Sequence, residues 1–240
     1  MNRISLVFLI LIGLLVVNTA QADNALQQEI ARGKLLVANE ALQDPNFDSA
    51  VVLIVGHGNL GTLGLIINRP FEDPNQIELP ADLVSLFKDS PRHFGGPVPS
   101  NGLIALVASD YTVPNAIHVH GNIYFLDNPQ AFEYLLNELE SPQPTRIYKG
   151  ISSWIPGQLA AEIRAGAWYV LDPQPALVFG DSTKMWEALL TKIHAKWVKS
   201  PVLEQKNLSH FSADSIILSY NKPLTIRFRY PNRSTFREND

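Results

Sequence analysis

The chain has 240 residues, of which 46% are hydrophobic and 18% are charged, with a formal net charge of −4 and no cysteine. This composition is typical of a folded domain with a sizeable core and excludes an intrinsically disordered chain. Without cysteine, the sequence excludes disulfides, thiolate metal sites and a cysteine nucleophile.

The N-terminus has the layout of a secretory signal peptide. Arg3 precedes an apolar run over Ile4–Val17, and Ala20–Ala22 fits the small-x-small pattern of a cleavage site. The run is shorter than the ~20 apolar residues that a membrane-spanning helix needs. We therefore predict cleavage after Ala22 (signal peptide 1–22) and a periplasmic or secreted mature protein. The alternative is an uncleaved segment that anchors the protein to the membrane.

The next segments predict a hairpin at the centre of a sheet. A short helix over 26–33 leads into a strand over 34–39. Residues 50–56 are a continuous β-branched run, which is typical of a strand buried on both faces. A turn at His57–Gly61 and a strand over 62–68 follow, so we predict that the two strands pair as an antiparallel hairpin.

The middle of the chain alternates short strands with helices. Residues 69–92 are rich in proline and acids and predict a surface excursion with a small helix near 80–87. Asn128-Pro129 is a helix-starting pair, and the helix behind it carries an apolar stripe. The other predicted elements here are a tight loop over 95–102, strands over 103–109 and 145–150, and a strand pair around Gly121-Asn122.

The stretch ISSWIPGQLAAEIRAGAW, residues 151–168, predicts a loop and a short helix. Pro156 suits the first turn, Ser152 or Ser153 can cap the helix, and Gly166 can end it. We therefore expect this stretch to have a structural role, which is to turn the chain and to begin and end a short helix. The functional alternative is that free amides near Gly157 and Gln158 bind an anion.

The C-terminal part predicts a strand over 168–173, a helix over 183–197 capped by Asp181 or Ser182, and a basic extension over 198–240. Residues 23–183 carry 8 Lys and Arg against 18 Asp and Glu, whereas residues 184–240 carry 10 against 5. Apolar and cationic residues alternate over 224–230, so we predict a β-hairpin that packs on the acidic body. The alternative is membrane-surface association, for which the candidate residues are Arg227, Arg229, Arg233 and Arg237.

Together these elements predict the α/β class, a layered α/β sandwich on a mixed, mainly antiparallel sheet, as one domain over 23–197. The sequence contains no nucleophile elbow, no His-Glu-x-x-His and no phosphate loop. We therefore predict no catalytic residue, no metal and no cofactor. His118 and His120 are expected to be a surface pair, and Glu40, Asp44 and Asp48 to be solvated.

Polar and glycine residues at turns and strand ends are the candidate ligand-binding positions, because sites often form there. They are His57, Asn68, Arg69, Gly95, Gly96, Trp154, Gly157 and Gln158.

Three segments in series resemble the YqgE/AlgH family of bacterial proteins. They are GKLLVANEALQDPNFDSAVVLIVGHGNLGTLGLIINRP, FGGPV and YKGISSWIPGQLAAEIRAGAWYVL, within residues 33–197. The resemblance implies an α/β sandwich with no agreed catalytic residues, and the label of transcriptional regulator that members often carry. Most members resemble cytoplasmic proteins, whereas this chain opens with an export signal.

Our leading hypothesis is an exported, non-enzymatic domain that binds a protein or small ligand of the cell envelope. Nucleic acid is disfavoured as a partner, because an acidic exported domain repels phosphates. The alternatives are a transcriptional regulator, as the family label implies, and a hydrolase with a groove near His57, Asn68, Arg69 and Trp154.

Overall fold

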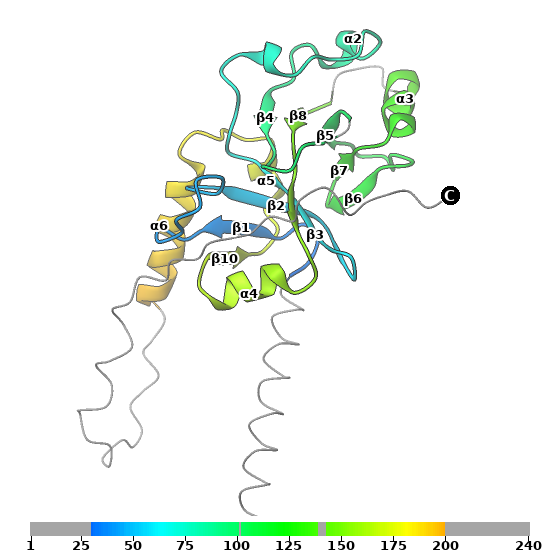
Figure 1. The fold of residues 1–240 in the computed structure, drawn as a ribbon. Coiled ribbons are helices and arrows are strands. Elements are labelled where there is room, and N and C mark those ends of the chain that lie inside the picture. Colours follow the sequence, from blue (N-terminus) through cyan, green and yellow to red (C-terminus); the bar gives the residue numbers. More distant parts are fainter. Residues whose placement is uncertain (1–29, 101, 139–142, 200–240) are drawn as a thin grey trace, which may run out of the picture.

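Ten strands form two five-stranded sheets in the computed structural model, which describes residues 30–100, 102–138 and 143–199 (Figure 1). The first sheet, sheet A, has the order β10-β1-β2-β3-β9, and all of its pairings are antiparallel. Its strands are β1 (Leu35–Ala38), β2 (Val51–Gly58), β3 (Gly61–Ile66), β9 (Ser152–Trp154) and β10 (Trp168–Leu171).

The second sheet, sheet B, has the order β4-β8-β5-β7-β6, and only the pair β4 and β8 is parallel. Its strands are β4 (Arg92–Phe94), β5 (Ile104–Ala108), β6 (Ile117–His120), β7 (Ile123–Leu126) and β8 (Thr145–Lys149). The predicted class, α/β with mixed and mainly antiparallel sheet structure, is confirmed. The division of the strands into two sheets was not specified by the sequence.

The main core lies between the two sheets, because apolar side chains of both meet in one cluster. Sheet A contributes Leu35, Val37, Val51, Leu53 and Leu65, and sheet B contributes Ile104, Leu106, Ile123, Phe125 and Tyr148. Both sheets are buried on their outer faces as well, in two smaller clusters. This double burial explains why the strands read as continuous apolar runs.

Short helices cover the outer faces and the end of the sandwich. Helix α4 packs over sheet A, and α2 and α3 pack over sheet B. The helices are η1 (Pro74–Gln76), α2 (Val84–Phe87), α3 (Pro129–Glu138), α4 (Gln158–Arg164), α5 (Pro175–Val178) and α6 (Met185–Lys199). None of the helices in the described ranges has the length and apolar character that a bilayer crossing requires.

The predicted central hairpin is confirmed. Strand β2 lies in the middle of sheet A, and Val51–Val55 are fully buried within it. It pairs with β3 in antiparallel register, with His57 opposite Thr62 and Gly58 opposite Gly61. The turn is therefore shorter than predicted, since both strands continue almost to its tip at Asn59 and Leu60.

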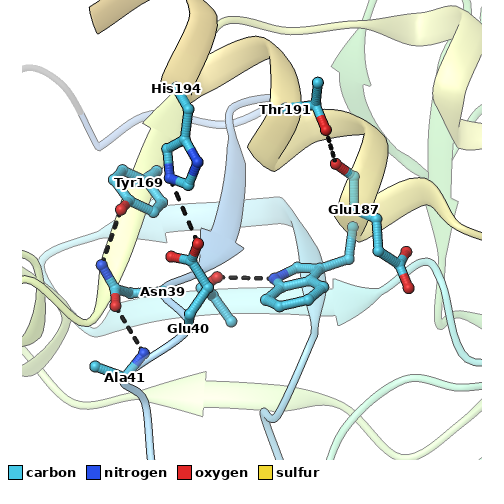
Figure 2. A network of polar contacts seen from close by, with 9 residues as sticks. Asn39, Glu40, Ala41, Tyr169, Glu187, Thr191 and His194 are labelled. Carbon is cyan, nitrogen blue, oxygen red and sulfur yellow. Dashed lines mark hydrogen bonds and ion pairs between the residues drawn. The ribbon is translucent and has the colours of Figure 1, made fainter.

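Helix α6 packs into the main core, and polar contacts join it to the chain around the end of β1 (Figure 2). Met185, Leu189, Leu190 and Ile193 enter the main core. The Trp186 indole donates to the carbonyl of Ala38 at 2.8 Å. Nearby, Asn39 donates to the hydroxyl of Tyr169 at 3.0 Å, and His194 lies 3.5 Å from Glu40. These contacts hold α6 against the start of the loop that follows β1.

The helix predicted over 26–33 is wrong where the structure describes it. Residues 31–34 form a turn, in which the Lys34 amide donates to the Ala31 carbonyl at 3.2 Å, and the amide of Gly33 donates to the carbonyl of Ile54 at 2.8 Å. Because this bond already joins the segment to β2, the backbone cannot continue as a helix. The predicted signal peptide and the C-terminal hairpin lie outside the described residues.

Candidate functional site

A pocket of about 480 Å³ lies between the β2–β3 hairpin and the turn that precedes α4. Two of the predicted site residues, His57 and Gly157, line it. The other lining residues are Ile30, Gly58, Asn59, Gly61, Thr62, Ile155, Pro156, Leu159 and Ala160. Its volume is within the range of ordinary small-ligand sites.

The wall formed by residues 155–158 is a type II turn. The carbonyl of Ile155 accepts from the Gln158 amide at 3.1 Å, with Pro156 and Gly157 at the central positions. Gly157 has φ 80° and ψ −17°, the left-handed conformation that this turn requires at its third residue. The Oε1 atom of the Gln158 side chain in turn accepts from the Ile155 amide, also at 3.1 Å. The Gln158 amide therefore already has an acceptor within the chain.

A buried carboxylate supports the turn from below. Glu162 is only 6% exposed, and its Oε2 accepts from the indoles of Trp154 and Trp168 at 2.9 Å each. Its Oε1 accepts from the Gln158 amide group at 3.1 Å. Burial raises the pKa of Glu162, and these three donors oppose that shift. The carboxylate thus joins β9, β10 and the turn through one side chain.

Helix α4 ends where the sequence predicts. Gly166 has φ 79°, its amide donates to Ile163, and the amide of Ala167 donates to Glu162. This pair of bonds is a Schellman motif. The predicted serine caps are wrong, because Ser152 and Ser153 lie in β9, and Gly157 occupies the N-cap position instead.

His57 stands at the pocket in a cross-strand pair with Thr62. Its Nδ1 lies 2.8 Å from the Thr62 hydroxyl. Thr62 itself is buried, with 4% of its surface exposed. Burial lowers the pKa of His57 and so favours the neutral form of its ring. A neutral imidazole can accept the Thr62 proton or, in its other tautomer, donate to the hydroxyl.

Asn68 and Arg69 lie away from the pocket and hold the loop between β1 and β2. The Asn68 side chain accepts from the Val51 amide and donates to the Ser49 carbonyl, both at 2.8 Å. The Arg69 guanidinium donates to the carbonyls of Asn46, at 2.6 Å, and Asp48. The structure thus gives these two predicted site residues a role in loop architecture.

Gly95 and Gly96 pack backbone against backbone. A side chain at Gly95 would collide with the carbonyl of Gly150, and one at Gly96 with the backbone of Ile151 and Ser152. The Ser152 hydroxyl also donates to the Gly95 carbonyl at 3.1 Å. The glycine pair therefore lets the chain after β4 approach the chain before β9.

The structure brings together His57, Trp154, Gly157 and Gln158, and separates Asn68, Arg69 and the glycine pair from them. Glu162 was missed by the sequence reasoning. Its spacing of four residues from Gln158 was the available signal, since such residues are neighbours on a helix.

Two other sequence-based expectations concern acids and histidines. Asp44 is not solvated as predicted, because it is 7% exposed and accepts from the Asn46 amide at 2.8 Å. His118 and His120 are exposed, as expected for a surface pair. Across the described ranges, no three His, Asp or Glu side chains converge as a metal site would require.

Comparison with solved structures shows the same fold in two proteins. The AlgH protein from Pseudomonas aeruginosa matches with a TM-score of 0.53 and 22% identity, over 71% of this chain and 93% of that one. A Corynebacterium diphtheriae protein matches with a TM-score of 0.57 and 22% identity, over 68% of this chain and 87% of that one.

Sequence relatives are closer. A UPF0301 protein of Streptomyces avermitilis is 37% identical over 169 residues, which cover 67% of this chain and 85% of the relative. A UPF0301 protein of Chlorobium luteolum is 35% identical over 163 residues, which cover 66% of this chain and 84% of the relative. The model of the AlgH-like family matches residues 35–198. Since that match spans most of the chain, the protein belongs to the AlgH-like family, as the sequence resemblance predicted.

Proposed function

We propose that this chain acts outside the cytoplasm as a binding domain, and that it receives an apolar side chain of a partner protein in the pocket beside the β2–β3 hairpin. The observation that carries this proposal is the exposure of large apolar side chains on both sides of the pocket. Leu60 is 97% exposed at the hairpin tip, and Ile155 is 57% exposed in the opposite turn.

Apolar side chains at such exposure favour a protein contact. Leu60 lies between Asn59 and Gly61, both of which line the pocket, and Ile155 lines it directly. Exposed apolar groups around a hollow are typical of interaction sites. The rigid type II turn and the paired hairpin strands hold this rim in place, which lowers the entropy cost of binding.

The N-terminal sequence supports export, and the charge of the body disfavours nucleic acid as a partner. Arg3, the apolar run over Ile4–Val17 and the small residues of Ala20–Ala22 are the parts of a secretory signal. The body over 23–183 has a net charge of −10, which opposes binding to nucleic acid phosphates. A partner in the cell envelope fits both features.

The test is affinity capture of a partner from the cell envelope with the wild-type chain and with Leu60→Ser and Ile155→Ser. We expect each substitution to reduce the recovered partner severalfold. Val84→Ser is the matched control, because Val84 is 41% exposed on α2 and does not line the pocket. Equal recovery with all three variants would refute the pocket, and an intact mass that includes residues 1–22 would refute cleavage.

A hydrolase is the second candidate, because the His57 ring lies 2.8 Å from the Thr62 hydroxyl beside the pocket. A neutral histidine at this distance can accept the proton of a nucleophilic hydroxyl. If this candidate is right, an ester substrate panel shows turnover that His57→Ala and Thr62→Val both abolish. Absence of turnover across the panel, or turnover unchanged in the variants, rejects it.

A further inference from the structure

A second pocket, also of about 480 Å³, lies where the chain enters the parallel strands β4 and β8. It is separate from the hairpin pocket and shares no lining residue with it. Its lining residues are Ser85, Leu86, Lys88, Asp89, Ser90, Pro91, Gln143, Pro144, Thr145, Arg146 and Phe179.

Arg146 places a buried positive charge at this pocket. The residue is 4% exposed, and its guanidinium donates to the carbonyls of Ile67, at 2.8 Å, and Gly180. Within the described ranges no carboxylate forms an ion pair with it. Hydrogen bonds from Thr183 and the more distant charge of Arg146 lower the pKa of the exposed Asp181. Buried cations are normally paired, so a guanidinium with only neutral contacts favours a bound anion.

Arg92 fixes the wall that faces Arg146. Its Nη1 donates to the carbonyls of Phe87 at 3.3 Å, Lys88 at 3.1 Å, and Ser90. These bonds attach the C-terminal end of α2 and the residues that follow it, up to Ser90, to the buried Arg92 side chain. The wall therefore presents the exposed Lys88 and the half-buried Ser90 from a backbone that is held in place.

We propose that this pocket binds a small anion through a carboxylate or phosphate group. Arg146 and Lys88 supply the positive charge, and the hydroxyls of Ser85 and Ser90 supply further donors. Asp89 is the one acid among the lining residues, so cations outnumber anions in the wall. The volume admits a ligand larger than the charged group itself, and Leu86 and Phe179 can contact its apolar part.

An anion bound at Arg146 should change the pKa of His93, a buried residue of β4. His93 is 1% exposed, its ring centroid lies 5.6 Å from that of Tyr148, and neither ring nitrogen has a hydrogen-bond partner. Burial and, to a smaller extent, the charge of Arg146 lower the pKa of His93 to about 4. A ligand that neutralises Arg146 removes that repulsion, so it raises the pKa of His93.

The experiment is an NMR titration of the purified chain, with the N-terminus that it carries in cells, against inorganic phosphate, citrate and the neutral sugar glucose. We expect saturable shifts of the backbone amides of Gln143, Thr145 and Arg146 with phosphate, with citrate or with both, and none with glucose. The more effective anion identifies whether phosphate or carboxylate is preferred. The His93 ring should titrate at higher pH when that anion is present.

Two charge-reversal variants distinguish an anion bound in this pocket from an anion attracted to any positive charge on the surface. Lys88→Glu should weaken binding about tenfold, because it reverses a charge at the pocket. Lys192→Glu makes the same charge change at an exposed position on α6 and should leave the affinity unchanged. Arg146→Gln should abolish anion binding if the variant folds. If that variant does not fold, the comparison of Lys88→Glu with Lys192→Glu still tests the proposal. Shifts that map away from 143–146, equal effects of the two lysine variants, or no saturable shift at millimolar anion would overturn the proposal.

Discussion

The indole of Trp168 donates to the carboxylate of Glu162 at 2.9 Å, and this bond ties helix α4 to the edge strand β10. Trp154 reaches the same carboxylate oxygen from β9, at the other edge of the sheet. The two indole rings meet edge to face, with centroids 6.1 Å apart. One acidic side chain thus joins both edges of sheet A beneath the hairpin pocket.

Removing that acid should destabilise the fold. Glu162→Ala leaves two buried indole N–H groups without an acceptor, so we expect the free energy of unfolding to fall by about 3 kcal/mol. Glu162→Gln keeps one carbonyl oxygen and should cost less. Urea denaturation measures both, with the exposed Glu187→Ala on α6 as the control. A Glu162→Ala chain as stable as the control would show that the carboxylate does not organise the sheet.

A drop in pH should reduce the free energy of unfolding through protonation of His93. The pKa of its ring is about 4 in the folded chain against 6.5 for the free side chain. Between these values the unfolded state binds more protons, so stability is full above pH 6.5 and falls as the pH drops toward 4. The loss amounts to about 3 kcal/mol, since one pKa unit corresponds to roughly 1.4 kcal/mol.

The check is urea denaturation of the wild type and of His93→Leu at pH 7 and pH 4.5. The variant lacks the titrating ring, so the difference between its two stabilities should be smaller than in the wild type. Other groups titrate equally in both chains and cancel in the comparison. The same loss in both chains would mean that His93 does not cause it.

Gly157→Ala should strain the turn at the hairpin pocket. Gly157 has φ 80°, and no heavy atom lies within 4 Å of an added Cβ, so the cost comes from the backbone conformation alone. We expect about 1 kcal/mol of destabilisation, measured by thermal unfolding, and weaker partner capture. Gly58→Ala is the matched control for the unfolding measurement, since Gly58 has equal open space without a positive φ. Equal unfolding temperatures for the two variants would contradict the type II turn.

Arg69→Ala should separate loop architecture from binding. The guanidinium bonds two carbonyls of the loop between β1 and β2, so its loss should cost about 1–2 kcal/mol. Because Arg69 does not line the hairpin pocket, partner capture should be unchanged under conditions where the variant stays folded. If a folded Arg69→Ala variant no longer captures the partner, Arg69 contributes to binding after all.

The sequence predicted local structure well where one strand follows another. The β-branched run of β2 and the glycine-containing turn after it specify the hairpin, because both signals lie within a few residues. The division into two sheets was missed because it depends on distant pairings, such as Ala38 opposite Trp168. Local periodicity carries no information about such partners.

The candidate site shows the same limit. Gly157 and Gln158 were found because proline and glycine mark turns directly. The sequence also predicts Asn68 and Arg69 as site residues because polar residues at strand ends often form sites, yet in the structure they satisfy backbone groups of a loop. Glu162 was missed because its two indole donors become its neighbours only in the folded chain.

If an exported domain receives a partner at the hairpin pocket, as we propose, site-specific photocrosslinking in living cells should capture that contact. A crosslinker placed at Leu60 or at Ile155 should join the chain to one discrete envelope protein, while the same group at Val84 should not. Identical products from all three positions, or a chain found only in the cytoplasm, would refute the proposed function.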